Sequence, residues 1–110
     1  MEISEKQDGK FSVLTPLGRL DNETSPEFQV KILYAVASGG AVVVDLSQVE
    51  YISSAGLRAL MMASKKAKAT NGRLAVAALT PMVKEIFDIS RFSLVVQVFE
   101  TVNDATTALS

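Results

Sequence analysis

Residues 45–57 read DLSQVEYISSAGL, and they connect an apolar strand to a helix. The β-branched run at residues 41–44 predicts a buried strand directly before them. Residues 55–70 are rich in Ala, Leu, Met and Lys, which favour a helix. The segment between the two is therefore predicted to be a strand-to-helix turn that places two hydroxyl side chains at the start of the helix.

The two serines of this turn have different expected roles. Ser53 is placed to act as N-cap, because its side chain can accept a hydrogen bond from a backbone N–H that has no partner inside the helix. Ser54 then becomes the first helical residue, with its hydroxyl on the rim. Gly56 follows without a side chain, and we expect it to keep that rim open to another protein.

Outward from this stretch, apolar runs and turn residues divide the chain into alternating elements. A polar turn at residues 7–10 separates the two opening strands. Strands are predicted at residues 1–5, 11–17, 41–44, 73–79 and 94–99. Pro16 cannot donate to a strand ladder, so we expect it at an edge or a bulge.

Helix signals lie between these strands. Ser25 and Pro26 predict an N-cap and a first helical position, and Thr80 with Pro81 predicts the same for a short helix. Either Thr101 or Asn103 is expected to cap a terminal helix that ends near Leu109.

The order of these elements favours one α/β domain over residues 1–110. After two strands, helices and strands alternate, which is typical of a mixed β-sheet of four to five strands with about four helices and parallel crossovers. In the first long helix, Phe28, Ile32 and Val36 recur at helical spacing and are predicted to face the core.

The composition argues against an enzyme. The chain has 110 residues, a net charge of −1, no Cys and no His, so it lacks the usual general base, the thiolate nucleophile and the commonest metal ligand. Residues 53–57 do not form the Gly-x-Ser-x-Gly turn of serine hydrolases. No cofactor is expected. No apolar run approaches the roughly 20 residues of a membrane span, and we expect a cytoplasmic protein.

Charge is distributed unevenly along the chain. Residues 51–84 contain six basic residues and no acidic one, whereas both flanking regions are net acidic. Such a segment can steer an acidic protein, nucleic acid or anionic lipid, or it can be an ordinary solvated helix face. We interpret most of these lysines as the solvated face. No direct binding to nucleic acid is expected, because few aromatic residues accompany the lysines for stacking on bases.

Three segments stand out in order along the chain: residues 18–21, residues 45–57 and residues 80–88. Together they resemble the STAS domain, the family of bacterial anti-sigma factor antagonists with relatives in anion transporters. Gly18-Arg19-Leu20-Asp21 is similar to the early Gly-x-Leu-Asp turn of that family. Residues 45–57 are similar to its phosphorylation segment, and residues 80–88 to its third-helix segment.

The resemblance implies a phosphorylation site and partners. The family segment reads Asp-Ser-Ser/Thr-Gly-Leu, and its first hydroxyl is the phosphoacceptor; the aligned residue is Ser54, with Ser53 in place of the Asp. It implies an anti-sigma factor with a histidine-kinase-like ATPase fold as serine kinase, and a serine phosphatase that reverses the modification. The partner surface implied includes these residues: Asp21, Ser53, Ser54, Ala55, Gly56 and Arg58.

Two other interpretations remain open at this point. The domain could be a scaffold in a sensory complex or an accessory subunit of a lipid or anion transporter, and Ser54 would then be structural. Asp45, at the end of a buried strand, also suggests a receiver-type phosphoacceptor. The opening strands lack the acidic pair that a receiver needs for Mg²⁺, so we expect Asp45 to accept hydrogen bonds in the turn after it, and Asp21 to be a turn residue.

Overall fold

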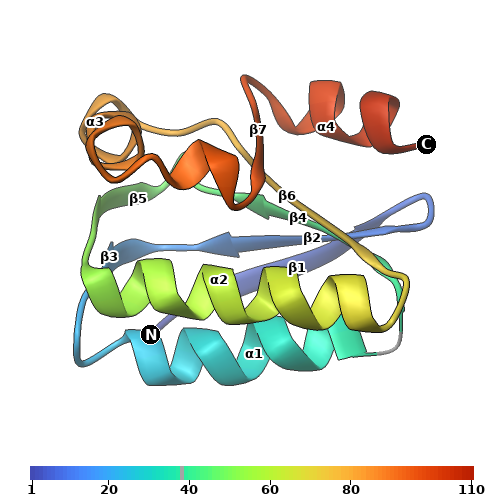
Figure 1. Cartoon of the computed structure of the whole chain (residues 1–110), viewed down its shortest axis with the longest axis horizontal. Coiled ribbons are helices and arrows are strands. Elements are labelled where there is room, and N and C mark those ends of the chain that lie inside the picture. The colour runs from blue at the N-terminus through green and yellow to red at the C-terminus, as the bar shows by residue number, and fades with distance from the viewer. Residues whose placement is uncertain (38) are drawn as a thin grey trace.

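Five strands form the main sheet, in the order β1-β2-β4-β6-β7 (Figure 1). The computed structural model describes residues 1–37 and 39–110. The strands of this sheet are β1 Ile3–Asp8, β2 Phe11–Pro16, β4 Ala41–Asp45, β6 Arg73–Ala77 and β7 Gln97–Phe99. The edge strand β1 is antiparallel to β2, and the other neighbours pair in parallel. The predicted mixed α/β sheet is therefore confirmed.

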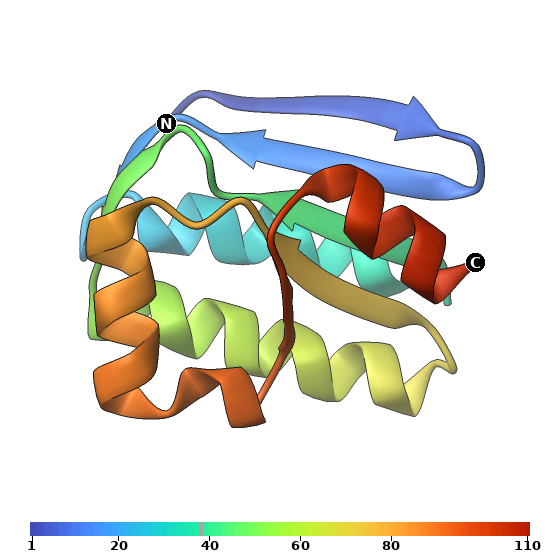
Figure 2. The ribbon, with the colours of Figure 1, turned by 90° about the horizontal axis from the view of Figure 1, so that it is seen from above.

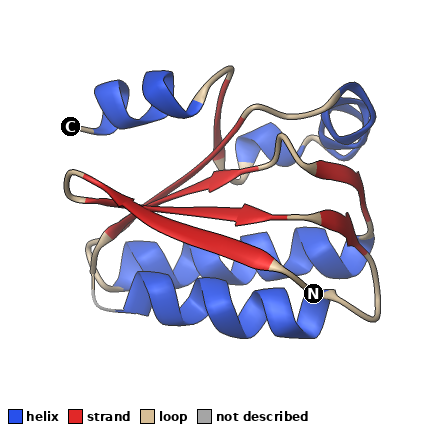
Figure 3. Ribbon diagram, turned by 180° about the vertical axis from the view of Figure 1, so that it is seen from behind, coloured by secondary structure: helices blue, strands red, loops and turns tan. Residues whose placement is uncertain are grey.

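Helices cover both faces of this sheet. On one face α1 (Ser25–Ala37) and α2 (Ser54–Ala69) lie side by side and begin at the same end of the molecule (Figures 1 and 2). On the other face lies α4 (Val102–Leu109), as the view from behind in Figure 3 also shows. The helix α3 (Pro81–Ser90) packs against β5 (Val49–Ile52), and a 3₁₀ turn over Phe92–Leu94 follows it.

The central strand β4 is buried on both faces. Its Val42 and Val44 belong to the large core beneath α1 and α2, and Val43 belongs to a smaller cluster beneath α4. Strands covered on both faces read as continuous apolar runs, which explains the β-branched run in the sequence. Phe28, Ile32 and Val36 of α1 are fully buried in the large core, as their spacing predicts.

A second, two-stranded sheet was not predicted. Strand β3 (Gly18–Leu20) pairs in parallel with β5, inside the segment that the sequence indicated only as a turn. Strands of three and four residues carry too little periodicity to be recognised, and they are stabilised by partners that are distant in sequence.

Several element boundaries differ from the prediction. Strand β1 spans Ile3–Asp8 instead of residues 1–5, so the predicted turn at residues 7–10 is shorter, and β6 ends at Ala77 instead of residue 79. Helix α1 begins at Ser25, one residue before the predicted first position, and the buried Ser25 hydroxyl has no hydrogen-bond partner among the described residues. Instead of acting as N-cap, Ser25 lies inside the first turn. The last strand begins only at Gln97, because residues 92–94 wind into the 3₁₀ turn that buries Phe92.

Truncating Phe28 to Ala should lower the free energy of unfolding by about 3–5 kcal/mol, because it leaves a cavity in a fully buried position. Tyr34, on the same helix, is 83% exposed, so Tyr34→Ala should change stability by less than about 0.5 kcal/mol. Urea unfolding followed by circular dichroism measures both. Equal losses would contradict the assigned burial of the two faces of α1.

Candidate functional site

The start of α2 is built as the sequence predicts. Ser53 is the N-cap, and its Oγ accepts a hydrogen bond from the Gly56 N–H at 3.4 Å. The Leu57 N–H donates to the Ser53 carbonyl at 3.0 Å. Ser54 is the first residue of the helix and is exposed. Its hydroxyl therefore lies beside a helix N-terminus, where a negative charge is favoured.

Gly56 has a different role from the predicted one. It is buried, and a Cβ atom at this position would lie 2.7 Å from Ile52 Cγ1 and 3.1 Å from Leu20 Cβ. The absent side chain thus makes room for the two short strands β3 and β5. The prediction that Gly56 keeps the rim open to another protein is wrong, because the glycine faces inward.

One backbone hydrogen bond connects the start of α2 to the end of β3, just before Asp21. The Ser53 N–H donates to the Leu20 carbonyl at 2.8 Å. Asp21 follows directly, so the loop that leads into α1 starts beside the first turn of α2. The start of α2 is thus coupled to a residue about thirty positions earlier in the chain.

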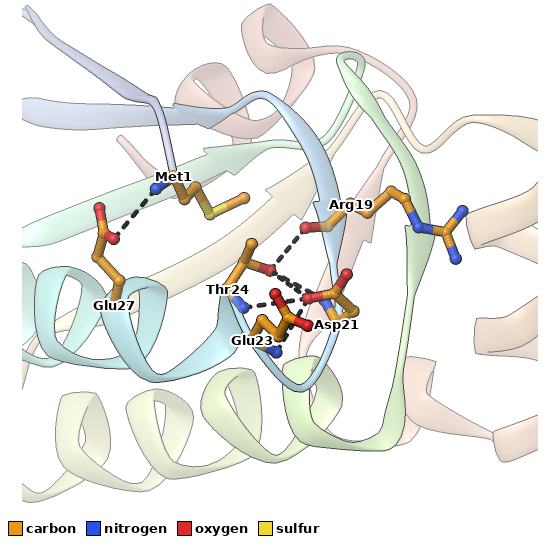
Figure 4. A network of polar contacts seen from close by, with 6 residues as sticks. All are labelled: Met1, Arg19, Asp21, Glu23, Thr24 and Glu27. Carbon is orange, nitrogen blue, oxygen red and sulfur yellow. Dashed lines mark hydrogen bonds and ion pairs between the residues drawn. The ribbon is translucent and has the colours of Figure 1, made fainter.

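Asp21 organises its own loop. Its Oδ1 accepts from the backbone N–H groups of Glu23 at 3.0 Å and Thr24 at 3.1 Å (Figure 4). The Thr24 hydroxyl accepts from the Asp21 N–H at 3.0 Å and donates to the Arg19 carbonyl at 2.7 Å. The Thr24 N–H in particular holds the pKa of Asp21 below its ordinary 3.8, although partial desolvation opposes this. Asp21 is a turn residue, as predicted.

A surface hollow lies between the first turns of α1 and α2. From α2 it is lined by Ser54, Ala55 and Arg58. From α1 and the loop before it, it is lined by Asn22, Ser25, Pro26, Gln29 and Val30. The sequence placed the three α2 residues together but did not find the α1 side, because no local pattern reports that two helices start side by side.

Asp45 lies in a turn of its own. Its Oδ1 accepts from the Ser47 N–H at 3.0 Å, and its Oδ2 accepts from the Thr15 hydroxyl at 3.5 Å. The predicted structural role is confirmed. In the part of the chain that the structure describes, no group of three His, Cys, Asp or Glu side chains is placed to hold a metal ion. No described helix has the length and hydropathy needed to cross a membrane.

The chain matches the family described as STAS domain over residues 2–105. It belongs to the STAS domain family. The match covers every strand, helices α1 to α3 and the start of α4. The resemblance noted in three short segments thus extends over almost the whole chain.

Several relatives of this chain are anti-sigma factor antagonists by name. BtrV of Bordetella bronchiseptica, provisionally assigned as one, is 34% identical over 76 residues, which are 68% of this chain and 66% of BtrV. The matched stretch therefore spans slightly less than two thirds of that relative. The crystal structure of an anti-sigma factor antagonist from Mycobacterium paratuberculosis has a TM-score of 0.88 at 28% identity, covering 97% of this chain and 92% of that one.

The same fold occurs in the anti-sigma factor antagonist SpoIIAA. Its unphosphorylated form has a TM-score of 0.79 at 17% identity, covering 98% of this chain and 96% of SpoIIAA. Its phosphorylated form, described as a Bacillus cell fate determinant, has a TM-score of 0.72 at 16% identity, covering 99% and 100%. At these identities the likeness is one of fold.

Replacing Gly56 by Leu should lower the free energy of unfolding by about 1–3 kcal/mol or more, because the side chain has no room against Leu20 and Ile52. Lys65→Leu places the same side chain at an exposed position of the same helix and should have little effect. Urea unfolding compares the two variants. A Gly56→Leu protein as stable as Lys65→Leu would show that the start of α2 is not packed as described.

Asp21 should titrate below pH 3.8 in the folded protein and near its ordinary value in urea-unfolded protein. Because the folded pKa is the lower one, the stability that this carboxylate contributes is present above pH 3.8 and is lost as pH falls through the folded pKa. Carbon-13 NMR of the side-chain carboxyl measures both midpoints. Thr24→Val removes the side-chain hydrogen bond but keeps the backbone N–H donor, so it should raise the folded pKa of Asp21 only part of the way toward the unfolded value. In the unsubstituted protein, a folded pKa at or above the unfolded one would contradict the loop geometry.

Proposed function

We propose that this protein is an anti-sigma factor antagonist whose binding is switched by phosphorylation of Ser54. In the unmodified state it binds an anti-sigma factor that is also an ATP-dependent serine kinase, and the sigma factor is released. The phosphorylated form dissociates, and a serine phosphatase regenerates the unmodified form. These partners place the switch in the cytoplasm, where ATP and sigma factors occur.

The observation that carries the proposal is the exposed hydroxyl of Ser54 at the capped start of α2. Ser53 takes over the capping, so the Ser54 side chain is not needed for the helix itself. The first turn of α2 has no acidic side chain that would repel a phosphate. Membership in the STAS family and relatives named as anti-sigma factor antagonists support the same role.

The chain acts in this scheme as a substrate and binding module. The Ser54 Oγ attacks the γ-phosphorus of ATP held by the kinase, the bond to the β-phosphate oxygen breaks, and ADP leaves. The hydroxyl proton passes to a base of the kinase, since the chain has no histidine to accept it. The fold shared with SpoIIAA, which is known in phosphorylated and unphosphorylated forms, is compatible with such a modification.

The phosphate acts on docking. It adds about −1.5 to −2 charges at pH 7 and three acceptor oxygens to the surface around Ser54. Within the domain, the N-terminus of α2 accommodates this charge. At the interface, burying even one uncompensated charge costs roughly 2 kcal/mol, which is more than tenfold in affinity.

Ser54→Ala should bind the anti-sigma factor kinase permanently and accept no phosphate, and Ser54→Glu should weaken binding at least about tenfold because of its buried charge. Ser53→Ala is the matched control: it loses the cap but keeps the acceptor, so it should still be phosphorylated. Intact mass after incubation with ATP and each anti-sigma factor kinase of the same genome measures modification, and calorimetry measures binding.

Three outcomes would contradict this proposal. Phosphate on Ser53 alone would mean that the acceptor is the N-cap residue, and an acid-labile phosphate on Asp45 would favour receiver chemistry. Normal binding by all variants, with no phosphate from any of the kinases, would leave Ser54 structural and support the scaffold or transporter role.

A further inference from the structure

The hollow beside Ser54 lies where two helix N-termini meet. Helices α1 and α2 run in the same direction and begin at the same end of the sheet (Figures 1 and 2). Both positive ends of the helix dipoles thus border the hollow, which is lined by the first turns of both helices. At α2, Ser53 takes the N–H groups of Gly56 and Leu57, which leaves those of Ser54 and Ala55 for solvent or an anion.

The side chains around the hollow add one positive charge. Of the described residues that line it, only Arg58 is charged. Arg58 follows Ser54 by four residues, so the two side chains share one face of α2. An arginine at this spacing can bond a phosphate on Ser54 through two N–H groups.

The carboxylates near the start of α1 do not line the hollow. Asp21 turns its Oδ1 into its own loop, onto the N–H groups of Glu23 and Thr24. The Glu27 Oε1 atom, in the first turn of α1, is 3.1 Å from the N-terminal ammonium of Met1 (Figure 4). Glu27 borders an adjacent hollow that shares only Val30 with this one. Glu23 is exposed and does not line the hollow. Another cation, Arg19 on β3, does not line the hollow; its guanidinium carbon lies 4.6 Å from the centre of the Tyr51 ring.

Ser25 provides an independent observation at the same place. It lines the hollow from α1, it is 2% exposed, and its Oγ is the only buried side-chain nitrogen or oxygen in the described residues without a hydrogen-bond partner. Leaving such a group unpaired is costly, so its position needs an explanation. A hydroxyl kept free beside two helix starts and an arginine is consistent with a site arranged for an anionic group.

We infer that, once Ser54 is phosphorylated, its phosphate is held within the same chain, in the hollow between α1 and α2, with Arg58 as its charged partner. This inference rests on the proposed phosphorylation of Ser54 and describes how it acts. The modification then changes two features of the docking surface at once. It adds negative charge, and it withdraws the Arg58 guanidinium from any acidic group of the partner.

The test uses full-length protein with phosphoserine placed at position 54 during translation, so no kinase is needed. Phosphorus-31 NMR follows the second ionisation of the phosphate, whose ordinary pKa is about 6. Because Arg58 and the helix starts favour the dianion, this pKa should lie about 0.5–1 pH unit lower in the folded protein than in urea-unfolded protein. Arg58→Gln should raise the folded-state pKa and remove most of this difference.

The matched control is Lys65→Gln, which removes the same charge from the same helix. Lys65 is exposed, lies about 16 Å from Ser54 along α2 and does not line the hollow, so its removal should leave the phosphate pKa nearly unchanged. A second readout is the Nε–H resonance of Arg58, which should titrate with the phosphorus midpoint, whereas that of the exposed Arg91 should not.

Equal pKa changes in Arg58→Gln and Lys65→Gln would overturn the inference, because the effect would then be one of net charge. An Arg58 Nε–H resonance that does not change as the phosphate ionises would also overturn it, because the guanidinium would then be free for the partner. Either result leaves the kinase experiment on Ser54 as it stands. Conversely, the translated phosphoserine could show the Arg58-dependent pKa while no kinase modifies Ser54. That result would refute the proposed function and support the phosphate site.

Discussion

The close packing of the first turn of α2 against Leu20 and Ile52 organises the rest of the site. It is possible only because residue 56 has no side chain, and it is accompanied by the hydrogen bond from the Ser53 N–H to the Leu20 carbonyl. This contact determines where the Asp21 loop begins and therefore where α1 starts. Two helices that are separated in the chain by a strand, β4, and by β5 thereby begin next to each other.

The electrostatics of the surface follow from this arrangement. Parallel crossovers on one face of a sheet make neighbouring helices run in the same direction, so their positive ends gather at one edge. Asp21 and Glu27 satisfy donors in their own neighbourhoods, and the hollow keeps a net positive lining. The basic residues of segment 51–84 therefore do not all have the same role. Arg58 faces the candidate site, whereas Lys65 and Lys66 form part of a solvated helix face.

Local sequence signals predicted the structure correctly where the stabilising interactions join residues close together in the chain. The Ser53 cap, the helix at 54–69 and the two-sided burial of β4 follow from hydrogen bonding and periodicity within a few residues, and they were predictable. The same holds for the Asp45 and Asp21 turns, in which a carboxylate binds a backbone N–H two or three residues on. Where several elements compete, as at Ser25 and at residues 94–99, tertiary packing moved the boundary.

The sequence by itself determined the α/β class, through the order of its elements, and the Ser53 cap at the start of α2, which depends on neighbours along the chain. The choice of Ser54 as candidate acceptor came from the resemblance of residues 45–57 to the STAS phosphorylation segment. Only the tertiary structure decided that β3 and β5 pair, that Gly56 faces inward, and that Ser54 and Arg58 share a hollow with Ser25 and Asn22. The physical reason is that these contacts join residues about 30 positions apart. Their geometry is set by how closely the first turn of α2 approaches β3, which no local propensity records.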